Sequence, residues 1–156
     1  MLASCGWTVI PEATFAYYSE RGSIDLLAWH AATRTLLVVE IKTEIVDVPE
    51  LLGVMDRKAR LAPRVARDRG LHPLAVATWL VVAESSANRQ RVARFRDLLR
   101  ASFPLGGVAM RRWLASPTGA VSGISFVRND SPGNAKRRSG TPKRVRADIP
   151  RSAKPA

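Results

Sequence analysis

Residues 23–42, SIDLLAWHAATRTLLVVEIK, decide what kind of fold this chain adopts. Two segments rich in Leu, Val and Ile, residues 23–29 and 35–42, flank the short segment AATR at residues 31–34. Such segments indicate β-strands, and a connection of this length is typical of a β-hairpin. The sequence therefore predicts two neighbouring antiparallel strands at this point.

Three charged residues, Asp25, Glu40 and Lys42, lie within or at the end of these otherwise apolar strands. A charge in such a segment is costly unless it is paired or binds a metal. Side chains alternate across a strand, so Glu40 and Lys42 must share one face. If the turn is centred within residues 31–34, the numbers of opposed residues add up to 65, which puts Asp25 opposite Glu40 and Ser23 opposite Lys42.

This register would bring two carboxylates together. The Cβ atoms of directly opposed residues lie about 4.5–5.5 Å apart, so both carboxylates could reach one divalent cation. Two carboxylates that share a cation beside a lysine are the components of metal-assisted phosphodiester hydrolysis. The alternative is structural: Glu40 and Lys42 form an exposed ion pair at a strand end, and Asp25 bonds to a turn.

The rest of the first 127 residues predicts further strands and helices around this hairpin. The expected elements are a strand over residues 7–18, a helix that starts at Pro49, a strand over residues 74–83, a helix from about residue 86 to residue 101, and short closing segments at residues 108–114 and 124–127. Pro63 is expected to end or kink the first helix, and residues 19–22 to form the first turn. The continuous apolar run at residues 74–83 is typical of a strand covered on both faces. These elements predict an α/β domain over residues 1–127, with a central mixed β-sheet flanked by helices.

The formal net charge of +12 is concentrated towards the end of the chain. Residues 1–127 hold 16 Lys and Arg against 11 Asp and Glu, a net of +5, whereas residues 128–156 hold 9 against 2, a net of +7. These last residues contain almost no large apolar side chain, which predicts a disordered basic tail. A partner that carries phosphates would explain the charge. Solubility, or a drift of composition towards arginine, is the alternative explanation.

Cys5 is the only cysteine among the 156 residues, which rules out an intrachain disulfide and a cysteine-based zinc site. The first residues lack the charged region and the apolar run of a signal peptide. No window approaches about 18 uninterrupted apolar residues. A cytoplasmic protein with no membrane partner is therefore expected.

Asp25, followed by Glu40-Ile41-Lys42 on the next predicted strand, resembles the PD-(D/E)xK nuclease superfamily, which includes restriction endonucleases and archaeal Holliday junction resolvases. The resemblance covers roughly residues 7–85 and looks closest to small bacterial proteins of unassigned role. It implies a restriction endonuclease-like fold and a Mg²⁺- or Mn²⁺-dependent nuclease that acts on DNA rather than RNA. A catalytically degenerate module that binds nucleic acid in a regulatory role is the alternative. Many proteins of that fold are homodimers, and the sequence leaves a homodimer open.

The resemblance also implies a role for each matching residue. Asp25 and Glu40 would ligate Mg²⁺ or Mn²⁺. Lys42 would orient or deprotonate the attacking water and stabilise the charge that develops on the phosphate. Ser23 matches a small polar position that would touch the scissile phosphate.

The chain departs from the superfamily pattern before Asp25. A helix that often carries another metal-binding acid usually precedes the first strand, but here a strand begins at Trp7, so this helix is expected to be missing or truncated. Glu12 and Glu20 are the only upstream acids. Glu12, on the first strand, is the better candidate for a third metal ligand; the alternative is an exposed strand carboxylate. Ile24 replaces the proline of the motif.

Basic residues on the two predicted helices are further candidates for contacts with nucleic acid. Lys58 and Arg60 lie on the first helix, and either they reach a phosphate or they form part of a solvated helix face. The later helix carries five arginines that would suit contacts with a nucleic-acid backbone. They are Arg89, Arg91, Arg94, Arg96 and Arg100.

Overall fold

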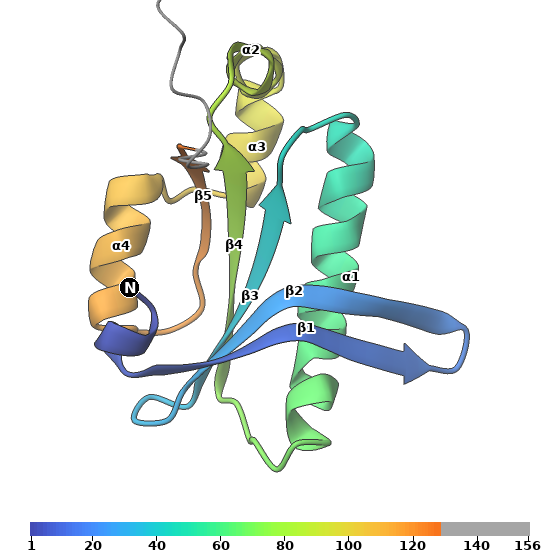
Figure 1. Cartoon of the computed structure of the whole chain (residues 1–156), viewed down its shortest axis with the longest axis vertical. Coiled ribbons are helices and arrows are strands. Elements are labelled where there is room, and N and C mark those ends of the chain that lie inside the picture. The colour runs from blue at the N-terminus through green and yellow to red at the C-terminus, as the bar shows by residue number, and fades with distance from the viewer. Residues whose placement is uncertain (129–156) are drawn as a thin grey trace, which may run out of the picture.

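A five-stranded mixed β-sheet forms the centre of the computed structural model, which describes residues 1–128 (Figure 1). The strands lie in the order β1-β2-β3-β4-β5, antiparallel from β1 to β3 and parallel from β3 to β5. The elements are a 3-10 helix Ala3–Cys5, β1 Trp7–Tyr17, β2 Glu20–His30, β3 Thr35–Lys42, α1 Val48–Arg67, β4 Ala75–Ala83, α2 Ser86–Arg94, α3 Arg96–Ser102, α4 Gly107–Ala115 and β5 Ser122–Val127. The predicted α/β class, with a mixed sheet flanked by helices, is confirmed. The predicted tail falls almost entirely outside the described residues.

The hairpin of β2 and β3 has the predicted register. Leu26 pairs with Val39 and His30 with Thr35, so opposed residue numbers add up to 65. The first turn is shorter than predicted, because β2 already begins at Glu20. Only two residues therefore separate β1 from β2, and one of them, Tyr18, has a left-handed backbone with φ 53°, the conformation that tight hairpin turns require.

Helix α1 continues through Pro63, where the sequence predicted an end or a kink, and ends at Arg67. A proline inside a helix removes one backbone hydrogen bond and costs about 3 kcal/mol. The last turn is nevertheless stabilised by packing, because Val65 and Ala66 are fully buried in one apolar cluster with residues of β1, β2 and β3. At its start, the side chain of Asp47 caps the helix by accepting a hydrogen bond from the backbone N–H of Glu50 at 2.8 Å.

The later part of the chain differs from the prediction in detail. The helix expected up to about residue 101 is divided into α2 and α3 at Phe95, whose φ of −108° and ψ of 29° are not helical. The segment at residues 108–114 is helical, as α4, and the last segment is the parallel edge strand β5. Among residues 1–128, no helix is both long and apolar enough to cross a membrane.

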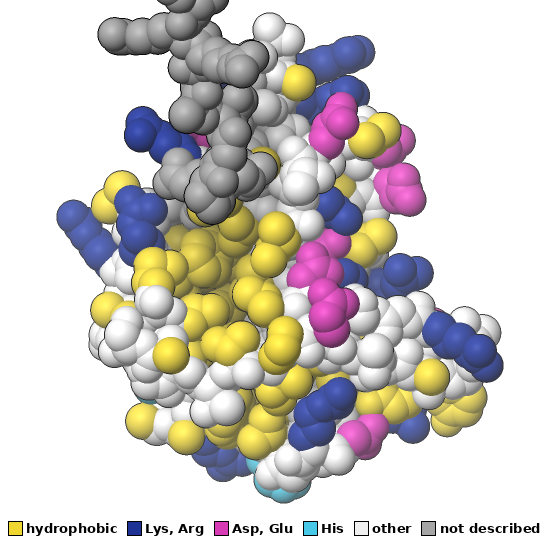
Figure 2. All heavy atoms as spheres, in the orientation of Figure 1, with side chains coloured by type: hydrophobic (Ala, Val, Ile, Leu, Met, Phe, Trp, Pro, Cys, Tyr) yellow, Lys and Arg dark blue, Asp and Glu magenta, His cyan; other side chains and the backbone are white. Residues whose placement is uncertain are grey.

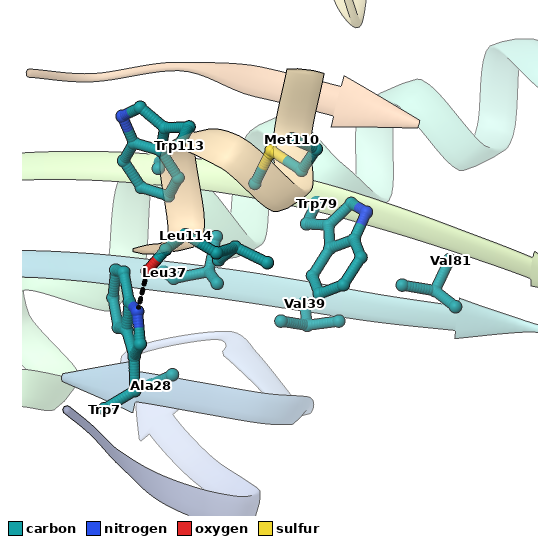
Figure 3. Packing of buried hydrophobic residues seen from close by; sticks show 10 residues of the cluster. Trp7, Ala28, Leu37, Val39, Trp79, Val81, Met110, Trp113 and Leu114 are labelled. Atoms are coloured by element: carbon teal, nitrogen blue, oxygen red, sulfur yellow. Dashed lines mark hydrogen bonds between the residues drawn. The ribbon is translucent and has the colours of Figure 1, made fainter. Parts of the chain in front are cut away.

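Helices cover both faces of the sheet. On one face, Leu36 and Val38 of β3 form an apolar cluster with Val65 of α1. On the other, α4 packs over the sheet, and Figure 3 shows Met110 and Trp113 among the buried side chains there. This second cluster fixes the position of β1, because the indole Nε1 of Trp7 donates to the carbonyl oxygen of Leu114 at 2.9 Å (Figure 3).

The free end of the β1–β2 hairpin is held on α1. Figure 1 shows this end as an arm that crosses α1 and projects beyond it. The Tyr17 hydroxyl donates to Asp68 Oδ2 at 2.5 Å, and the Arg64 guanidinium lies 4.3 Å from the centre of the Tyr17 ring. Arg60 of α1 forms an ion pair with Glu20 at 2.7 Å. Polar contacts and cation–π contacts therefore fasten the arm to the helix.

Alkaline pH should loosen the arm. Burial, the hydrogen bond to Asp68 and the negative charge of Asp68 raise the pKa of Tyr17 above its ordinary value of about 10. The contact therefore contributes its full stability below pH 10 and loses it as the pH rises through the raised pKa. Tyr17 and Tyr18 are the only tyrosines, so in Tyr18→Phe the near-ultraviolet absorbance of tyrosinate reports Tyr17 alone. It should appear at a higher pH in the folded protein than in the same protein unfolded in urea; coincident titrations would contradict this account.

Candidate active site

The strands β2 and β3 separate at Asp25. Their ladder ends at the pair Leu26 and Val39, so Asp25 and Glu40 are the next residues on the two strands. Beyond this point the backbone N–H of Ile41 donates to Asp25 Oδ2 at 2.8 Å. In a continued antiparallel ladder, an N–H that points to the neighbouring strand bonds to a backbone carbonyl. The carboxylate of Asp25 therefore takes over as acceptor at the place where the strands diverge.

Glu40 carries the most deeply buried charge of the site. Its residue is only 2% exposed, on the face of β3 that α1 covers. One oxygen, Oε1, forms an ion pair with Lys42 Nζ at 2.8 Å, which confirms that Glu40 and Lys42 share a face. The other oxygen, Oε2, bonds to Lys58 Nζ. A buried carboxylate requires this kind of compensation, because an unpaired charge in the interior is strongly unfavourable.

The ammonium group of Lys58 connects the two acids. It donates to Glu40 Oε2 and also to Asp25 Oδ1, at 3.2 Å. Two carboxylates from neighbouring strands thus converge on one cationic group, and two lysines balance their charge. The lysine of the motif, Lys42, is more open to solvent, with 36% of its side chain exposed against 10% for Lys58.

The sequence prediction misplaced Lys58, which neither forms part of a solvated helix face nor points to the surface. The residue is 8% exposed and belongs to the buried side of α1. The sequence spacing indicates this burial, because Lys58 lies in the row of residues, three and four apart, that forms the apolar face of the helix. That row consists of Leu51, Met55, Lys58, Ala62 and Val65. A lysine in such a row should be assigned a buried acidic partner.

The third metal ligand predicted at Glu12 does not join the other two acids. The register of β1 and β2 places Glu12 across from Asp25, but its backbone has a φ of 47° and its side chain is exposed. Its Oε2 accepts a hydrogen bond from Ser23 Oγ at 3.4 Å. Within residues 1–128, no three Asp, Glu, His or Cys side chains form a group that could hold a metal ion.

Arg60 lies outside the cluster. Its ion pair with Glu20 is exposed, and the hydrogen bond from Arg60 lowers the pKa of Glu20. Ile41, between the two charged residues of β3, is 47% exposed. Of the candidate residues, the structure therefore brings Asp25, Glu40, Lys42 and Lys58 together, and leaves Glu12, Ser23 and Arg60 at the periphery.

A surface pocket of about 160 Å³ opens beside Lys42. The loop after β3 and the first turns of α1 form its walls, and three acids, Glu44, Asp47 and Glu50, line it together with Lys42. Lys42 is therefore the member of the cluster that lies closest to open space.

The donor set fits one divalent cation. Asp25 Oδ1 and Glu40 Oε2 both bond to one atom, Lys58 Nζ, so a cation that replaced this ammonium group would meet both oxygens. Mg²⁺ is commonly held by one or two carboxylates, with water and substrate oxygens as its other ligands. Asp25 and Glu40 satisfy that requirement without a third acid.

Searches of protein-family models, curated proteins and solved structures found no match to this chain.

Removal of the Lys58 ammonium should destabilise the domain. In Lys58→Met the new side chain has a similar length but no charge, so Lys42 is the only remaining counter-ion of the buried Glu40 carboxylate. A broken buried ion pair lowers the free energy of unfolding by about 3 kcal/mol. Lys42→Met should cost less, about 1 kcal/mol, because its side chain is partly exposed. The free energies of unfolding can be measured by urea denaturation. The double variant Glu40→Gln, Lys58→Met should recover part of the loss; equal losses for Lys42→Met and Lys58→Met would refute the assignment of Lys58 as the main counter-ion.

Proposed function

We propose that this chain is a divalent-metal-dependent nuclease that hydrolyses phosphodiester bonds, in DNA rather than RNA, through a restriction endonuclease-like domain. One observation carries the proposal. Asp25 and Glu40, from two diverging strands, bond to the same ammonium group, and Lys42 is paired with Glu40 on its solvent-facing side. This arrangement combines two convergent carboxylates with a lysine that is partly open to solvent, which is the set of residues in the PD-(D/E)xK motif.

The order of elements supports the same proposal. A hairpin, β2–β3, is followed by a helix, α1, and by a strand, β4, that is parallel to β3. The two acids lie on the hairpin strands, at the point where the strands separate. A divergence of this kind gives carboxylates room to bind a group that a continuous ladder would exclude.

Each residue of the cluster has a distinct task in this proposal. Asp25 and Glu40 would hold Mg²⁺ or Mn²⁺, and the ion would supply a Lewis acid and an activated water. Lys42, next to open space, would orient the attacking water and stabilise negative charge on the phosphate. Lys58 neutralises the two carboxylates in this structure and would release them to the metal.

A second candidate function is a catalytically inactive domain that binds nucleic acid. Two observations favour it. Lys58 already compensates both carboxylates, and Glu12 remains outside the cluster. If metal does not displace the ammonium group, the cluster is a structural ion network, and exposed basic residues elsewhere in the domain would bind a polyanion.

Cleavage of supercoiled plasmid distinguishes the two functions. The wild-type protein should cut the plasmid with Mg²⁺ or Mn²⁺ and not with EDTA. Asp25→Asn removes a metal ligand and Lys42→Gln removes the positioned ammonium, so each should lower the rate at least about a hundredfold. The readout is conversion of supercoiled to nicked and linear DNA on a gel.

Matched controls use charged residues away from the cluster. Asp97→Asn on α3 and Arg112→Gln on α4 change the same charges and should leave the rate unchanged, because both residues are exposed. Urea denaturation establishes that each variant is folded. Plasmid binding without metal-dependent cutting by the wild type would instead support the inactive binding domain.

A further inference from the structure

Helix α1 presents a row of arginines to solvent on the side opposite its buried face. The residues follow one another at intervals of three, four and three, which is the spacing of one helix face. We call this row the arginine face; it consists of Arg57, Arg60, Arg64 and Arg67. All of its members are exposed. Ten residue-to-residue steps separate Arg57 from Arg67, so the row is about 15 Å long.

Most of the positive charge on this face is not neutralised. Arg60 is paired with Glu20, but within residues 1–128 no carboxylate lies within 4.0 Å of Arg57, Arg64 or Arg67. Asp68, the acid nearest in sequence to Arg67, accepts the hydrogen bond of Tyr17. The arginine face therefore has at least three guanidinium groups available to an anionic partner.

The hairpin arm extends this surface. Tyr18 at the tip is 93% exposed, and its ring centre lies 5.6 Å from the Arg64 guanidinium. Arg21, also exposed, follows on β2. Figure 2 shows basic side chains at the projecting end of the arm. The arm thus adds a basic group and an exposed aromatic ring beside the arginine face.

We propose that the arginine face, together with the hairpin tip, is the surface that binds the phosphate backbone of nucleic acid; this inference rests on the proposed function. Arg57 directly precedes Lys58, so one end of the face lies one residue from the carboxylate cluster. With one phosphate per about 3.4 Å of axis in each strand, 15 Å corresponds to roughly four phosphates. Arginine suits such contacts because its planar group bonds to phosphate oxygens in pairs. The contacts carry no base information, so binding is independent of sequence.

Fluorescence anisotropy tests the surface without relying on catalysis. Labelled duplex and single-stranded DNA of the same sequence are titrated with full-length protein in EDTA, over a range of salt concentrations. The triple variant Arg57→Gln, Arg64→Gln, Arg67→Gln should bind the preferred form more than about tenfold more weakly, with a salt slope lower by about three. A control with the same loss of charge, Arg34→Gln, Arg111→Gln, Arg112→Gln, removes exposed arginines of the β2–β3 turn and α4 and should change affinity less than about threefold.

The outcomes separate the surface from the nuclease proposal. Because both variants keep the nine basic residues of residues 128–156, non-specific binding by that segment is common to both. Equal losses in the two variants would overturn the inference, since net charge alone would then explain binding. The inference would also fail if the arginine-face variant kept its DNA affinity and lost binding to anionic lipid vesicles. If the arginine-face variant loses DNA binding and the wild-type protein cuts no DNA, the results would support the binding surface and reject the nuclease.

Discussion

The buried carboxylate of Glu40 sets the main constraint on this domain. It lies within the apolar layer between the sheet and α1, where an uncompensated charge would be strongly destabilising. Lys42 supplies one counter-charge from the same strand, and Lys58 supplies the other from the facing helix. Together with the apolar side chains of α1 that pack on the sheet, the contact with Lys58 holds the helix against β3.

The same ammonium group relates stability to the proposed activity. While it bridges Asp25 and Glu40, the two carboxylates remain close together although both are negatively charged. A divalent cation would meet the same two oxygens with more charge. In the proposed function, metal binding would therefore be an exchange of cations, in which Lys58 gives up its contacts with the two carboxylates. The affinity of this exchange would separate the proposed nuclease from the proposed binding module.

The arrangement of the hairpin was predictable from the sequence because it depends on local rules. A four-residue loop fixed the register of β2 and β3, and alternation fixed the shared face of Glu40 and Lys42. The helix α1 and the buried strand β4 followed from periodicity and from a continuous apolar run.

Features that depend on tertiary contacts were not predicted. Pro63 lies inside α1 because the following turn is buried, which a local rule does not include. Lys58 was assigned to the surface by its charge, although its spacing places it on the apolar face; its role requires the position of two acids on other elements. Glu12 was expected to complete a metal site, but its positive φ and exposed side chain place it at the edge of the cluster.

Paramagnetic broadening by Mn²⁺ tests most directly whether the two carboxylates form a cation site. In two-dimensional NMR spectra of labelled protein, substoichiometric Mn²⁺ should first broaden the amide signals of Asp25 and residues 40–42, including the Ile41 N–H that bonds to Asp25. Excess Mg²⁺ should reverse the effect, and Asp25→Asn should abolish it. Broadening confined to the acidic pocket of Glu44, Asp47 and Glu50, or no selective broadening in the wild type, would contradict the account.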